Sequence, residues 1–213
     1  MEDRGRGLPG LHRRRRQGQR LLRRGDQAQP GAADRRPTLT TSVRTARLRL
    51  TPVGPEDIED LLLLYGDPIV ARWTGPWTPE SVAAWAVAMA RRWSTAGVAK
   101  WMARDVADGS LVGRGGFTRI ELDGTTVLEL GWVVRDALTG RGYATELGRA
   151  AIAWAGEHFP ELPIVAFTEV HNGASRAVME RLGMRLAGII RRPGLVEGEP
   201  GIHPDAPFAL YRL

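Results

Sequence analysis

The chain has 213 residues, no cysteine and a formal net charge of +6 at neutral pH. This length suits one domain and a tail, and the lack of cysteine excludes disulfides, thiolate metal sites and cysteine nucleophiles. The sequence contains neither an apolar run long enough to span a membrane nor an apolar N-terminal segment. We therefore expect no transmembrane helix and no secretory signal, and we predict a cytoplasmic protein.

The basic charge is concentrated at the N-terminus. Residues 1–37 contain eleven arginines and four acids, a net charge of +7 against +6 for the whole chain, so the remainder carries −1. A segment with so few apolar residues cannot offset the entropy of ordering. We predict a basic, disordered tail over residues 1–40 and one folded domain over 41–213. The tail is either a dispensable leader or an arm for nucleic acid, and the near-neutral body argues against a nucleic-acid-binding domain.

Period-two and period-3.6 apolar patterns predict the elements of the folded part. Expected strands cover residues 47–52, 98–106, 111–120, 127–134, 164–170, 184–191 and 208–213, and expected helices cover 55–65, 78–93, 142–158 and 173–182. Asp108-Gly109 and Asp123-Gly124 are hairpin signals between successive strands. This order of elements predicts an α+β domain.

A glycine-rich turn joins the strand at 127–134 to the helix at 142–158. The turn has the sequence Thr139-Gly140-Arg141-Gly142-Tyr143-Ala144. Its glycines permit tight curling of the backbone, and the first N–H groups of the helix lack intrahelical acceptors and favour an anion. Neither the dinucleotide nor the P-loop spacing is present. The turn predicts a diphosphate site, with an ordinary tight turn as the alternative.

Two motifs carry a resemblance to a known family. The turn resembles the Arg/Gln-x-x-Gly-x-Gly/Ala motif of the GNAT acetyltransferases. Residues 172–184 are similar to the Asn-x-x-Ser…Leu-Gly-Met/Phe signature of the branch that contains the ribosomal-protein alanine and serine N-acetyltransferases. The resemblance runs from about Thr45 to Leu213. Two departures are Thr139, where the family has Arg or Gln, and Met179, where many relatives have a Tyr that protonates the departing thiolate.

The resemblance implies the GNAT fold, with a mixed central sheet splayed between its fourth and fifth strands and flanked by four helices. It implies acetyl-CoA as co-substrate and no metal. The residues expected to hold the cofactor are Trp132, Val133, Val134, Thr139, Gly140, Arg141, Gly142, Tyr143, Ala144, Thr145 and Asn172.

The expected chemistry needs a base, an acid and an acceptor pocket. Glu129 is the first candidate base because it lies in a largely apolar strand, although it is equally suited to pair with an arginine; Glu169 is the second. Ser175 is the candidate proton or hydrogen-bond donor to the thiolate, with helix capping as its alternative role. Trp73 and Trp77 are expected to bind the acceptor or, equally, to cover the core. The histidines show no metal-ligand spacing.

These features predict an enzyme that transfers an acetyl group from acetyl-CoA to a primary amine by direct attack in a ternary complex. The acceptor is a protein N-terminus or a small-molecule amine, and a homodimer is left open. The alternative is a non-catalytic acyl-CoA sensor with the same fold.

Overall fold

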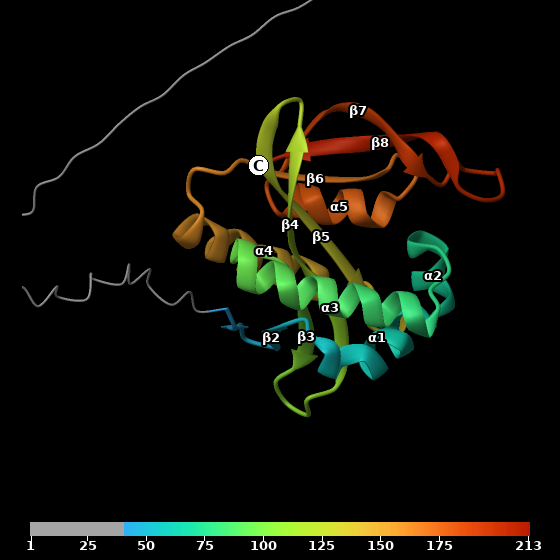
Figure 1. Cartoon of the computed structure of the whole chain (residues 1–213). Coiled ribbons are helices and arrows are strands. Elements are labelled where there is room, and N and C mark those ends of the chain that lie inside the picture. The colour runs from blue at the N-terminus through green and yellow to red at the C-terminus, as the bar shows by residue number, and fades with distance from the viewer. Residues whose placement is uncertain (1–40) are drawn as a thin grey trace, which may run out of the picture. The chain divides into compact units, whose positions relative to one another are not determined.

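A computed structural model describes residues 41–213 as one α+β domain (Figure 1). The tail predicted over residues 1–40 lies outside the described residues. The strands are β1 (Val43–Arg44), β2 (Leu48–Pro52), β3 (Lys100–Asp105), β4 (Leu111–Leu122), β5 (Thr125–Val134), β6 (Ile164–Glu169), β7 (Arg185–Gly194) and β8 (His203–Arg212). The helices are α1 (Ile58–Tyr65), α2 (Pro68–Thr74), α3 (Pro79–Ala96), α4 (Tyr143–His158) and α5 (Gly173–Arg181), with 3₁₀ turns at Pro55–Asp57 and Asp136–Leu138.

All eight strands form one sheet in the order β1-β2-β3-β4-β5-β6-β8-β7. Every neighbouring pair is antiparallel except β5 and β6, which are parallel and pair only at Leu128–Ile164 and Glu129–Val165. Beyond Glu129 the two strands diverge, and β5 continues to Val134 paired with β4 alone. The predicted splay between the fourth and fifth long strands is therefore confirmed at β5 and β6.

The core of the domain contains a cluster of three tryptophans. Trp101 of β3 is fully buried, and its ring centroid lies 5.1 Å from Trp93 of α3 and 5.1 Å from Trp154 of α4. In Figure 1, α3 crosses in front of β4 and β5, so its apolar face packs toward the middle of the sheet. This packing fixes α3 and α4, which both contribute to the site described below.

Two elements differ from the sequence-based expectation. The structure adds α2, which the sequence did not predict and which includes Trp73. Asp67 accepts hydrogen bonds from the backbone of Ile69 and Val70, and Pro68 occupies the first helical position. Strand β8 begins at His203 rather than at Phe208. Pairing with β7 extends the strand to His203, in spite of the two prolines in this segment. None of the helices within residues 41–213 combines the length and apolarity that a membrane crossing requires.

Candidate active site at the divergence of β5 and β6

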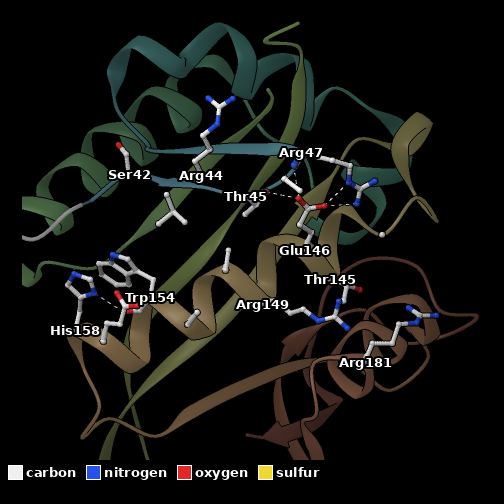
Figure 2. A pocket seen from close by; sticks show the side chains of 16 residues that line it. Ser42, Arg44, Thr45, Arg47, Thr145, Glu146, Arg149, Trp154, His158 and Arg181 are labelled. Carbon is white, nitrogen blue, oxygen red and sulfur yellow. Dashed lines mark hydrogen bonds and ion pairs between the residues drawn. The ribbon is translucent and has the colours of Figure 1, made fainter. Parts of the chain in front are cut away.

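A central cleft opens where β5 and β6 separate. It has a volume of about 950 Å³ and is lined by the end of β5, the turn at 138–145, the end of β6, and parts of α2, α3, α5 and the β7–β8 segment. A second hollow, the outer groove, has a volume of about 1130 Å³ and lies between Ser42–Arg47 and the outer face of α4 (Figure 2). The two hollows share Gly142, Thr145 and Arg181, so they meet at the N-terminus of α4. We place the chemistry in the central cleft because the separated strands leave backbone groups unpaired there.

The turn before α4 presents a row of free backbone amides. Gly140 and Gly142 have φ angles of +77° and +82°, a region that favours glycine. Within residues 41–213, no acceptor is found for the backbone N–H of residues 140–145, and Gly142, as the N-cap of α4, offers no side chain to cap them. These amides add to the positive end of the helix dipole. The turn is therefore built to accept an anion such as a diphosphate.

A polar clasp holds this turn against β2. Glu146 accepts from the Arg47 backbone N–H at 2.9 Å, from Arg47 Nε at 2.7 Å and from Thr45 Oγ1 at 2.5 Å (Figure 2). Arg47 Nη1 also donates to the Arg141 carbonyl at 3.0 Å, and its guanidinium lies over the Tyr143 ring. Burial alone would raise the pKa of Glu146, but these hydrogen bonds and the Arg47 charge outweigh it and hold the pKa below its ordinary value.

The far half of β5 exposes unpaired backbone to the cleft. Leu128 N–H donates toward β6, to the Pro163 carbonyl, whereas Arg135 N–H donates toward β4. Because a strand alternates with period two, the N–H groups of Trp132 and Val134 face the β6 side, past the last β5–β6 pair. The Val133 N–H faces β4 instead. The open edge offers peptide groups that can pair with an amide-containing chain.

Two carboxylates line the cleft in different surroundings. Lys100 Nζ lies 3.1 Å from Glu129 Oε2 and donates to the Gly116 carbonyl at 2.9 Å. Burial lowers the pKa of Lys100, although the neighbouring Glu129 opposes that shift. Glu169 is buried and accepts only long hydrogen bonds, from Leu195 N–H at 3.5 Å and Thr168 Oγ1 at 3.4 Å. Within residues 41–213, Glu169 has no ion-pair partner. Glu129 thus has a partner, but a lysine rather than an arginine.

The start of α5 brings Asn172 and Ser175 into the cleft. Asn172 is buried, and its Oδ1 caps the helix by accepting from the Ser175 backbone N–H at 3.1 Å. The Ser175 hydroxyl has no hydrogen-bond partner in the described part of the chain, so capping occupies only its backbone. Met179 is buried and lines the cleft one helical turn further on.

The two predicted acceptor tryptophans occupy different environments. Trp73 lines the cleft, and its ring lies 5.2 Å from the His171 ring. Trp77 is stacked on Tyr65, with ring centroids 4.3 Å apart, and is not among the residues that line the cleft.

The cleft lining also does not include Arg141, whose side chain is exposed.

Sequence reasoning missed many residues of the cleft wall, among them one aromatic and three cationic side chains of α3, β3 and β4. Trp85 and Arg92 of α3, Lys100 of β3 and Arg114 of β4 all line it. Only Trp85 showed a signal, as part of the apolar face of its helix. No local pattern marks the other three, because their partners lie far away in the sequence. Within residues 41–213, no cluster of side chains suited to bind a metal ion is found.

A helix start with free amides suits a phosphate group, and the unpaired strand edge beside it suits a chain with amide groups. A transferase that uses an acyl-coenzyme A needs both features in one site. Residues 47–185 match the model of the acetyltransferase (GNAT) domain. Because that match covers more than half of the chain, the protein belongs to the GNAT acetyltransferase family and is an acyltransferase. The predicted family, fold class and enzyme class are thus confirmed, and membership implies acetyl transfer from acetyl-CoA.

Comparison with other proteins gives a sequence relative and several solved structures with the same fold. The chain is 28% identical over 154 residues to the uncharacterized protein YkkB of Bacillus subtilis (strain 168), covering 71% of this chain and 90% of the relative. It resembles the structure of a putative ribosomal-protein-serine acetyltransferase from Vibrio cholerae, with a TM-score of 0.67, 20% identity and coverage of 83% and 98%. It also resembles the microcin C7 self-immunity acetyltransferase MccE, solved with acetyl-CoA and AMP, with a TM-score of 0.66, 14% identity and coverage of 79% and 93%.

The clasp on the phosphate turn generates the first prediction. Glu146→Gln should destabilise the domain at neutral pH by about 1–2 kcal/mol, a modest value because the Arg47 side chain is 43% exposed. Since the folded-state pKa of Glu146 is depressed, its stabilisation is complete above the unfolded pKa and is lost as pH falls through the folded pKa. The gap between the wild type and the variant should therefore close in acid.

The measurement is urea unfolding between pH 7 and pH 3. Glu157→Gln serves as the matched control, because it removes the same charge from an exposed position on the same helix. The clasp would be contradicted if both variants lost the same free energy of unfolding relative to the wild type, or if the loss in Glu146→Gln did not depend on pH.

Proposed function

We propose that the protein transfers an acetyl group from acetyl-CoA to a primary amine by direct attack in a ternary complex. The observation that carries this proposal is the set of free amides at residues 140–145 beside the unpaired edge of β5. The amides would hold the diphosphate of coenzyme A, and the edge near Trp132 and Val134 would pair with its amide-containing arm. In the reaction the amine nitrogen forms a bond to the acetyl carbon, the carbon–sulfur bond breaks, and the thiolate gains a proton.

The cofactor residues bind unequally in this proposal. Gly140, Gly142, Tyr143, Ala144 and Thr145 contribute backbone amides. Thr139 replaces the family's Arg or Gln at little cost, because backbone groups make most of the cradle. Asn172 positions the start of α5, and Arg141 and Val133 take secondary places, since the cleft excludes the Arg141 side chain and the Val133 N–H faces β4.

The acceptor has to lose a proton before attack, and two carboxylates compete as base. A free α-amino group has a pKa of about 7.7–8.0, against about 10.4 for a lysine side chain, so a protein N-terminus needs less help. We favour Glu169, because it is buried in the cleft wall without a cationic partner. Glu129 is the competing base, and one of its oxygens already accepts from Lys100.

Cofactor binding separates this proposal from an unrelated use of the fold. Isothermal titration should show acetyl-CoA binding to the wild type, and Gly140→Ala should weaken it about tenfold or more, because the strain of a non-glycine residue at positive φ displaces the amides. Gly124→Ala is the matched control: its φ of +75° is close to the +77° of Gly140, and both sites have open space around the added Cβ. No binding by the wild type, or equal binding by both variants, would reject the proposed turn.

The two candidate bases are separated by kcat/KM measured on an amine that the enzyme acetylates. Glu169→Gln should lower kcat/KM by about a hundredfold or more, as expected for a lost general base. Glu129→Gln should lower it much less. The reverse result would assign the role to Glu129, and an unchanged kcat/KM in both variants would indicate an ordered water.

Ser175 is the proposed donor to the departing thiolate. Ser175→Ala should lower kcat by about a hundredfold while leaving acetyl-CoA affinity unchanged, because the helix cap uses the backbone N–H and survives the substitution. Ser175→Thr retains a hydroxyl and should recover part of the rate. Equal losses for both variants would point to a packing role.

A screen read by mass spectrometry for the gain of one acetyl group identifies acceptors among peptides with free N-termini and small amines. The alternative, an acyl-CoA sensor without turnover, is favoured if acetyl-CoA binds and no amine releases thiol. The putative ribosomal-protein-serine acetyltransferase among the neighbours makes N-terminal peptides the first acceptors to try.

A further inference from the structure

Arg114 of β4 is held in a fixed orientation in the wall of the central cleft. Its Nε donates to the Tyr65 hydroxyl at 2.6 Å, and its guanidinium lies 5.0 Å from the Trp85 ring and 5.4 Å from the Tyr65 ring. Trp77 in turn stacks on Tyr65 and meets Trp85 edge-on. The aromatic cluster therefore positions this guanidinium in advance of any ligand.

This guanidinium has no counter-ion in the described part of the chain. No carboxylate within residues 41–213 forms an ion pair with Arg114. Tyr65 is not a counter-ion either: burial raises the pKa of its hydroxyl above the ordinary value, and the nearby Arg114 only partly opposes that shift. The hydroxyl is neutral at physiological pH, so it orients Arg114 without balancing its charge.

The surrounding wall adds to the positive charge. Arg92 of α3 and Lys100 of β3 line the cleft with Arg114, and Glu129 pairs with Lys100 alone. Burial is the main cause of the lowered pKa of Lys100, and both Arg114 and Arg92 contribute further to that lowering. Both arginines therefore lie close enough to Lys100 to act on its charge. Because Glu129 pairs with Lys100, the guanidinium groups of Arg92 and Arg114 are left in this wall without an ion-pair partner within residues 41–213.

We propose that the acceptor amine carries an anionic group, a carboxylate or a phosphate, and that Arg114 binds this group with its free Nη donors while Arg92 adds charge at the rim. The inference rests on the proposed function and specifies the substrate class of that site. A planar guanidinium whose orientation is already fixed matches the two oxygens of a carboxylate or phosphate. The bound anion also offsets the repulsion that the two arginines exert on Lys100.

The coenzyme's phosphates are a less suitable ligand for Arg114. Arg114 is paired with Val133 in the β4–β5 ladder and packs on residues of α1 and α3. The free amides lie at the start of α4, where Arg149 and Arg181 flank Thr145 (Figure 2). Those arginines and amides serve an anion at that end of the cleft, which leaves Arg114 for the acceptor.

Matched acceptor pairs test the proposal kinetically. Each pair presents the same amine with and without the anion: an amino acid and its amide, phosphoethanolamine and ethanolamine, and peptides with Asp or Asn as second residue. The wild type should prefer the anionic member by about tenfold or more in kcat/KM, as expected for a charge-assisted pair of hydrogen bonds. The first two pairs distinguish carboxylate from phosphate. Arg114→Gln should abolish the preference, because it lowers kcat/KM for the anionic member of each pair by about tenfold more than for the neutral member.

Control variants show whether an effect comes from the position and geometry of the Arg114 charge, and acetyl-CoA affinity shows whether it comes from the cofactor site. Arg91→Gln removes an exposed cation beside Arg92 that does not line the cleft, and it should retain the preference. Arg114→Lys keeps the charge but loses the planar guanidinium with its paired donors, so it should recover part of the preference. The proposal would be overturned if the wild type did not prefer the anionic member, or if Arg114→Gln lowered kcat/KM equally for both members of each pair. A parallel loss of acetyl-CoA affinity would assign Arg114 to the cofactor.

Direct titration keeps the inference independent of turnover. Inorganic phosphate and succinate should bind the wild type and Arg91→Gln equally, and Arg114→Gln at least about tenfold more weakly. Binding that Arg114→Gln leaves unchanged would place the anion elsewhere and reject the site. If no amine of either kind is acetylated, the proposed function fails, whereas this titration still decides whether Arg114 binds anions.

Discussion

The separation of β5 from β6 is the constraint on which the site depends. Two parallel strands normally satisfy each other's backbone, yet here the pairing stops at Glu129 while β5 runs on to Val134. Each N–H or C=O left without a partner costs free energy unless water or a ligand pairs with it. The fold therefore maintains an open edge that a peptide-like ligand would complete.

The open edge persists because other contacts hold its two sides apart. On one side, β4 pairs with β5 along ten residues and the Trp93–Trp101–Trp154 cluster packs α3 and α4 together around β3. On the other side, β6 is paired with β8 along its length. The clasp between Glu146 and Arg47 then fixes the start of α4, so the amides of the turn keep their direction. Rigid surroundings of this kind are what a preorganised site requires.

Local patterns predicted the parts of the molecule that local physics determines. Asp123-Gly124 indicated a hairpin, and both residues adopt positive φ angles there. The glycines at 140 and 142 indicated a turn with free amides, and the structure has it. Helix α2 was missed, although its Asp67-Pro68 start was legible as a capping signal. Strand β8 was predicted too short, because its first residues are held by pairing with β7, which the local pattern does not reveal.

Pairings between distant residues could not be read from the sequence. Lys100 and Glu129 are 29 positions apart, and Arg114 and Tyr65 are 49 apart. Glu129 was expected to be either a base or the partner of an arginine, yet its partner is the single lysine among the 30 basic residues. The single lysine occurs where an arginine would fit poorly: it is buried and donates both to the Gly116 carbonyl and to Glu129. A compact ammonium has donors for both partners, whereas a planar guanidinium is larger and fans its donors in one plane. The only lysine therefore lies where the cation is enclosed. The residues at 92 and 114, which line the cleft, are arginines.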